Sequence, residues 1–138
     1  TLAPIDDATL ARQTDVVVEG KVVSSSSSWV GRRIATFHLV VTGGEKPSSF
    51  VVAVPGGIVD DVGQMVPGAP QLVVGRRYRL LLGAADGPPL AGQAARRIVG
   101  FWQGVWLLDG NGVIPFDARG VPRTELHTTS PLAPATMR

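Results

Sequence analysis

Hydrophobic and polar residues alternate along much of the chain, which is the pattern of half-buried β-strands. Five segments carry this alternation or an apolar run of strand length: residues 15–24, 34–42, 50–54, 77–82 and 97–108. A tight-turn signal, DGNG, follows the last segment, and residues 113–116 are predicted to pair back across that turn. The pattern therefore predicts five or six antiparallel strands.

The connections between these strands are rich in glycine, proline and serine. We expect loops at 24–28, where five serines follow one another, at 56–75 and at 83–93. In the strand at 34–42, the odd positions from Ala35 to Val41 are predicted to face the core. His38, at an even position, is then predicted to face solvent.

One short helix is predicted at 6–13, where Asp6 and Asp7 favour a helix N-terminus. The expected organisation is an N-terminal extended segment and helix (1–14), a β-domain (15–117) and an extended C-terminal tail or linker (118–138). The fold class is all-β with that single helix. A small closed barrel of the OB type is favoured because closure removes the sheet edges, and a β-sandwich is the alternative.

Composition narrows the class of protein. The chain has 138 residues, 44% of them hydrophobic and 17% charged, against roughly 25% charged residues in average soluble domains. Its net charge of +2 comes without the dense basic patch of a nucleic-acid binder. No cysteine is present, which excludes disulfide scaffolds, thiolate zinc sites and cysteine nucleophiles. No apolar run approaches the roughly 18 residues of a membrane span.

Two stretches resemble known sequences and together cover about residues 8–83. DATLARQTDVVVEGKVVSSSSSW, followed by TFHLVVTGGEKP, resembles the start of netrin-like domains, the OB-type barrel of tissue inhibitors of metalloproteinases. VPGGIVDDVGQMVPGAPQLVVGRRYRLLL looks like a motif of uncharacterised bacterial secreted or surface proteins. The resemblance implies an OB-like barrel and an extracellular or cell-surface location.

The inhibitory mechanism of that family is not implied. Metalloproteinase inhibitors of this fold chelate the zinc of their target with an N-terminal cysteine, whereas this chain begins with Thr1 and has no cysteine. Only the fold is carried over, and a fold by itself does not define a function.

Motifs for catalysis are missing. His38 and His127 lack the HxH and HExxH spacings of metal ligands, and the serines at 24–28 lack a GxSxG context. Asp60 and Asp61 do not have the spacing of a calcium-binding loop. The sequence therefore predicts a protein that is not an enzyme and has no cofactor or metal.

Candidate interface residues come from three places. Trp102 and Trp106 share one face of the strand expected at 97–108, where core packing is favoured over a protein interface or an aromatic ligand platform. Asp60 and Asp61 lie in the long loop. Arg77 and Arg79 share the face of the strand at 77–82 opposite Tyr78 and Leu80. These six residues (Trp102, Trp106, Asp60, Asp61, Arg77 and Arg79) are the predicted contact residues.

The leading hypothesis is a non-enzymatic extracytoplasmic module that acts through protein–protein contacts, with a capacity to assemble with copies of itself. Low charge, a strand that is apolar on both faces and extended proline-containing ends favour this function. One alternative is an inhibitor or pro-domain-like regulator of a secreted protease, with 56–75 as its contact loop. The other is a glycan-binding module that uses Trp102 and Trp106.

Overall fold

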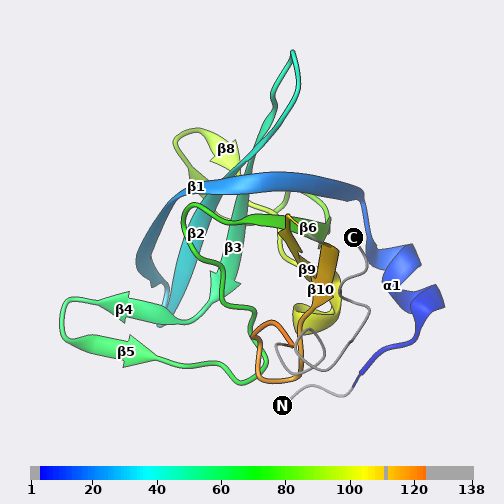
Figure 1. Cartoon of the computed structure of the whole chain (residues 1–138). Coiled ribbons are helices and arrows are strands. Elements are labelled where there is room, and N and C mark those ends of the chain that lie inside the picture. Colours follow the sequence, from blue (N-terminus) through cyan, green and yellow to red (C-terminus); the bar gives the residue numbers. More distant parts are fainter. Residues whose placement is uncertain (1–3, 111, 124–138) are drawn as a thin grey trace.

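The computed structural model describes residues 4–110 and 112–123. These residues form one α-helix, one short 3-10 helix and ten strands, arranged around a six-stranded antiparallel sheet (Figure 1). The elements, in chain order, are α1 (Asp7–Gln13), β1 (Val16–Val30), β2 (Arg33–Thr42), β3 (Ser49–Pro55), β4 (Gly57–Val59), β5 (Val62–Gln64), β6 (Arg77–Leu82), β7 (Pro89–Leu90), β8 (Gln93–Ala94), the 3-10 helix Phe101–Gly104, β9 (Val105–Asp109) and β10 (Gly112–Pro115).

The predicted helix and the predicted turn are both confirmed. Helix α1 begins after Asp6, whose side chain accepts a hydrogen bond of 2.7 Å from the Thr9 N–H, as an N-cap does. Leu10 is the buried residue of this helix. At the other end of the chain, β10 pairs back on β9 with Gly112 opposite Asp109.

The large sheet has the strand order β10-β9-β6-β1-β2-β3. Strand β1 is its longest member and pairs with β6 along its first half and with β2 along its second. The loop predicted at 24–28 is wrong, because β1 continues through these serines to Val30, with Ser25 opposite His38 and Ser27 opposite Thr36. Serine has little preference for strands, and here the pairing with β2 outweighs that local tendency.

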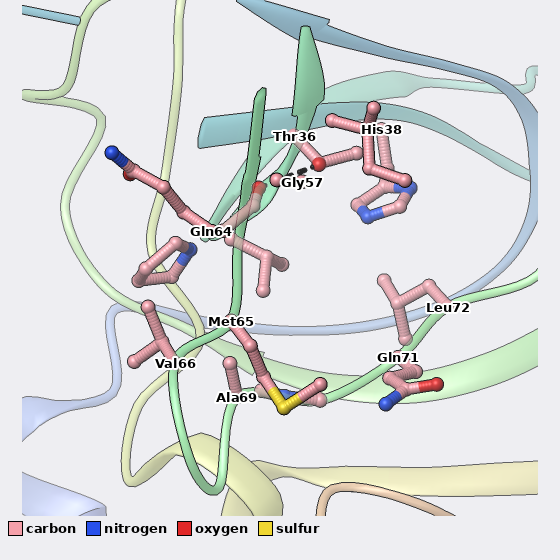
Figure 2. Close-up of a pocket in the computed structure, with 15 residues that line it drawn as sticks. Thr36, His38, Gly57, Gln64, Met65, Val66, Ala69, Gln71 and Leu72 are labelled. Atoms are coloured by element: carbon pink, nitrogen blue, oxygen red, sulfur yellow. Dashed lines mark hydrogen bonds between the residues drawn. The ribbon is translucent and has the colours of Figure 1, made fainter. Parts of the chain in front are cut away.

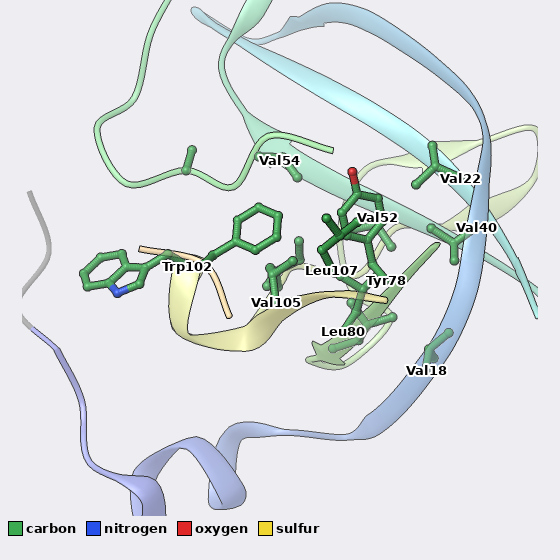
Figure 3. Packing of buried hydrophobic residues seen from close by; sticks show 14 of the residues in the cluster. Val18, Val22, Val40, Val52, Val54, Tyr78, Leu80, Trp102, Val105 and Leu107 are labelled. Atoms are coloured by element: carbon green, nitrogen blue, oxygen red, sulfur yellow. The ribbon is translucent and has the colours of Figure 1, made fainter. Parts of the chain in front are cut away.

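The main core lies on one face of this sheet, and Figure 3 shows side chains from β1, β2, β3, β6 and β9 gathered there. The Tyr78 ring is buried and makes an edge-to-face contact with Phe116, the ring centroids being 6.0 Å apart. The Tyr78 hydroxyl accepts a hydrogen bond of 2.9 Å from the Val73 N–H, which satisfies its polar end.

The face of β2 that was predicted to form the core is only the minor one. Val40, at an even position, is buried in the main core, and Ile34, also at an even position, is buried too. Phe37, at an odd position, packs in a second, smaller cluster with Val51 and Ala95. Alternation could not identify the main face, because chain segments cover both sides of β2 and β3.

The single strand expected at 97–108 is also wrong. Gly100 and Phe101 adopt left-handed backbone conformations with φ of 75° and 54°, so the chain turns there into the 3-10 helix before β9 begins at Val105. The other two expected loops contain small hairpins. The loop at 56–75 contains β4–β5, and the loop at 83–93 contains β7–β8, which ends one residue later at Ala94.

The predicted C-terminal tail lies mostly outside the described residues. Its described part, 118–123, is hydrogen-bonded to the rest of the fold. The Gln71 N–H donates to the Gly120 carbonyl, and the Arg123 N–H donates to the Pro115 carbonyl, each at a distance of 2.9 Å.

The sheet edges are connected by single bridges rather than by a full ladder. Arg96 forms a parallel bridge with Val52 of β3, and Ile98 forms an antiparallel bridge with Leu82 of β6. Within the described residues, β3 and β10 are the edges of the six-stranded sheet. The closed barrel therefore stays a prediction, whereas the mostly β fold with a six-stranded antiparallel sheet is confirmed.

The turn into β9 provides a test of this packing. A Cβ added at the buried Gly104 would collide with the Val99 carbonyl oxygen and would lie 3.1 Å from Ile98 Cγ2. We expect Gly104→Ala to lower the free energy of unfolding by about 3 kcal/mol, measured by urea denaturation. The control Gly43→Ala, where nothing lies within 4 Å of an added Cβ, is expected to change it by less than about 0.5 kcal/mol. Equal effects of the two variants would contradict this packing.

Candidate functional site

A pocket lies between the β2–β3 end of the sheet and the β4–β5 hairpin. It has a volume of about 590 Å³, and we call it the hairpin groove (Figure 2). Its lining contains no aspartate, glutamate, lysine or arginine, and its one titratable side chain is the imidazole of His38. Its lining residues are Thr36, His38, Val54, Pro55, Gly56, Gly57, Ile58, Gly63, Gln64, Met65, Val66, Ala69, Pro70, Gln71 and Leu72.

Polar contacts hold the root of the hairpin against β2. The Thr36 hydroxyl donates a 2.8 Å hydrogen bond to the Gly56 carbonyl, and the Gln64 side-chain oxygen accepts one of 2.7 Å from the Ile34 N–H. Gly57 has a φ of 138° and lies so close to Thr36 that no Cβ would fit. The hairpin is therefore fixed at its root by contacts with residues of β2 that lie 20 and 30 residues earlier in the chain.

His38 lies at the inner side of this groove and is not solvated as predicted. Its side chain is only 4% exposed, and its Nδ1 shares a hydrogen bond of 2.6 Å with the Ser25 hydroxyl. Burial disfavours the charged imidazolium and lowers the pKa of His38 from 6.5 to about 4. The imidazole is therefore neutral at pH 7, and the groove carries no charge.

The rim of the groove is apolar and faces solvent. Ile58 is 71% exposed and Met65 is 89% exposed, and Val62 of β5, which does not line the groove, is exposed as well. Asp60 and Asp61 form the exposed turn between the two short strands, and Figure 1 shows this hairpin extending away from the large sheet. The first part of the predicted long loop is thus a hairpin with apolar sides and an acidic tip.

The two tryptophans do not form a paired platform. Trp102, in the 3-10 helix, is only 7% exposed and packs in the main core, where an added Cβ at Gly68 would lie 3.2 Å from its ring. Trp106 is half-buried on β9, directly opposite Arg79 of β6. Core packing, the favoured interpretation, is confirmed for Trp102. Their predicted common strand face does not exist, so the glycan alternative loses the platform on which it depends.

Arg77 and Arg79 share the outer face of β6, as predicted, and Tyr78 and Leu80 are buried on the other. The Arg79 Nε lies 2.7 Å from a carboxylate oxygen of Glu19 on β1, in an exposed ion pair. Such a pair contributes little to stability, and it neutralises half of the predicted basic pair. Of the six predicted contact residues, only Asp60 and Asp61 lie on the element that borders the groove.

The described residues contain no cluster of three or more histidine, cysteine, aspartate or glutamate side chains that could hold a metal ion. Nor does that part of the chain include a helix long and apolar enough to cross a membrane. His127 lies outside the described residues.

Sequence reasoning missed the polar residues that build the groove: Thr36, His38 and Gln64. A signal for two of them exists in the alternation of threonine and histidine at positions 36 and 38, but only the register places them opposite Ser27 and Ser25. No protein family, curated protein or solved structure matches the chain. The groove is therefore interpreted from its own chemistry.

The buried histidine predicts a pH dependence of stability. As the pH falls from 6.5 to about 4, the unfolded chain binds a proton at His38 and the folded chain does not. Stability that is present above pH 6.5 is therefore lost across this window, by about 3 kcal/mol. Urea denaturation of the wild type and of His38→Gln at several pH values isolates this contribution.

We expect the difference between these two proteins to shrink steadily as the pH falls. A wild type and a His38→Gln variant that lose stability in parallel between pH 6.5 and 4 would show that His38 is not buried in its neutral form.

Proposed function

We propose that this protein is a non-enzymatic module that acts through protein–protein contacts, at the cell surface or outside the cell, and that it assembles with copies of itself. The observation that carries the proposal is the pair of highly exposed apolar side chains, Ile58 and Met65, at the rim of the hairpin groove. The location outside the cytoplasm depends on the sequence resemblance alone.

The chemistry of the hairpin favours a protein as its partner. Exposed apolar residues gathered on one element mark interaction sites in soluble proteins, and an exposed methionine adapts its shape to varied surfaces. The groove beside them offers apolar walls with a few hydroxyl, amide and imidazole groups, and no fixed charge. Such a lining suits apolar side chains of a partner together with neutral hydrogen-bonding groups.

The backbone of the hairpin supports the same conclusion. Strands β4 and β5 pair only with each other among the described residues, so each has an outer edge that does not belong to a ladder. A two-stranded hairpin is marginally stable alone, and a free strand edge is a template for pairing with another chain. A partner that covers this hairpin would therefore satisfy both its apolar side chains and its edges.

The same proposal includes an OB-like barrel. Strand β1 pairs with both β2 and β6, β2 pairs with β3, and Arg96 and Ile98 connect β3 to β6 by bridges. The Arg96 N–H donates a 2.8 Å hydrogen bond to the Val51 carbonyl, and the Ala53 N–H donates a 3.0 Å hydrogen bond to the Arg96 carbonyl. Each of these segments is therefore paired with the next: β1 with β2, β2 with β3, β3 with the chain at 95–99, that chain with β6, and β6 with β1. This closed series of pairings supports a barrel in which one pairing is parallel.

The test of the proposed function is self-association measured by sedimentation velocity from micromolar to near-millimolar concentration. We expect the mass of the wild type to rise with concentration. In the variant Ile58→Ser/Met65→Ser, the association constant should fall by about tenfold or more, because apolar area is no longer buried at the contact.

The matched control is Val17→Ser on β1, which is 56% exposed and lies away from the groove lining. It is expected to associate as the wild type does. A wild type that stays monomeric at every concentration, or a Val17→Ser variant as impaired as the hairpin variant, would overturn the proposal.

A further inference from the structure

A second pocket lies at the root of the hairpin, and we call it the basic pocket. Its volume is about 340 Å³, and it shares Val54, Pro55 and Pro70 with the hairpin groove. Most of its wall is apolar, but two arginines belong to its lining. The full lining is Val30, Arg33, Ile34, Ala35, Ala53, Val54, Pro55, Pro70, Pro88, Arg97, Ile98 and Phe101.

Neither arginine is neutralised by a carboxylate of the described residues. Arg33 and Arg97 are exposed, and no carboxylate of the described residues forms an ion pair with either; the arginines of the three ion pairs found there are Arg79, Arg96 and Arg119. The Arg97 side chain passes over Gly83, where an added Cβ would lie 3.2 Å from its Cζ. The pocket therefore combines apolar walls with two positive charges available to a ligand.

The hairpin tip has the complementary composition. Asp60 and Asp61 are exposed and form no ion pair with any described residue, and exposed Ile58 and Val62 flank them on the two strands. The tip thus offers two negative charges with apolar side chains on either side. Acidic and apolar groups on the tip match basic and apolar groups in the pocket.

The position of the pocket explains how two copies can use both features together. The basic pocket is at the root of the hairpin, because its lining residue Pro55 ends β3 and only Gly56 separates it from the start of β4. Two hairpins that lie side by side in opposite directions place each tip beside the root of the other. A twofold axis between them makes the two contacts equivalent, as in most soluble homodimers.

We infer that two copies of this chain associate reciprocally, each placing the Asp60–Asp61 tip of its β4–β5 hairpin in the basic pocket of the other. Carboxylates of one copy pair with Arg33 and Arg97 of its partner, and Ile58 and Val62 cover the apolar walls. Arginine suits this role because its planar guanidinium can bind a carboxylate through two hydrogen bonds. The inference rests on the proposed function and names the surfaces that carry it.

The experiment is an exchange of charges between tip and pocket, with sedimentation velocity as the measurement. The tip variant is Asp60→Asn/Asp61→Arg, since Asp60 has a φ of 52° that asparagine tolerates better than arginine does. The pocket variant is Arg33→Glu/Arg97→Glu. Each variant alone is expected to associate at least about tenfold more weakly than the wild type, because like charges then meet or the attraction is lost.

An equimolar mixture of the two variants is the decisive sample. The positive tip of the first meets the negative pocket of the second, and the unchanged tip of the second meets the unchanged pocket of the first. We expect the mixture to recover association, which also shows that both variants are folded. The control Arg12→Glu/Arg76→Glu makes the same change of charge at exposed sites outside the pocket lining and is expected to associate as the wild type does.

The outcomes separate this inference from the proposed function. If either charge variant associates as the wild type does, or if the mixture fails to recover, the reciprocal contact is overturned. The proposed function then stands or falls on the Ile58→Ser/Met65→Ser variant alone. A wild type that stays monomeric overturns both.

Discussion

The whole structure depends on the ability of β1 to pair along both of its edges. At Gly20 the strand is opposite Thr42 of β2 and Tyr78 of β6 at the same level. A Cβ at this position would lie 2.8 Å from both the Val41 carbonyl oxygen and Val40 Cγ1, so only glycine allows the strands to come this close. Past the irregularity between Val22 and Ser24, β1 pairs with β2 alone. This second half of β1 lies beside the part of β2 that lines the hairpin groove.

The serine-rich half of β1 links the sheet to the hairpin. The Ser25 side chain is hydrogen-bonded to His38 at 2.6 Å, and the Ser27 side chain is hydrogen-bonded to Thr36 at 2.8 Å. The Thr36 hydroxyl in turn donates to the Gly56 carbonyl. A buried polar group is costly unless it is hydrogen-bonded, so these pairs explain how β2 can place polar side chains on the face that it turns toward the core. They also anchor the hairpin without covering its apolar sides.

The β4–β5 hairpin has charges of opposite sign at its tip and at its root. Some arginines are paired within the described residues, as Arg79 is with Glu19 and Arg96 is with Asp15, whereas charges of opposite sign without an ion pair to a described residue lie at the tip and at the root of one hairpin. Unpaired charges beside exposed apolar groups gain most from a partner that supplies both complements. In the proposed self-assembly, a second copy of the same chain supplies both complements.

The sequence by itself determined the elements that depend on near neighbours: helix α1 with its Asp6 cap, the alternation that buries Tyr78 and Leu80 on β6, and the turn that joins β9 to β10. Only the tertiary structure decided that the serines belong to a strand, which face of β2 meets the main core, and that the chain turns at Gly100 and Phe101. Those features depend on partners far away in the chain. His38 and Gln64 come together at one groove because β2 and the hairpin meet in space, and no local pattern encodes that meeting.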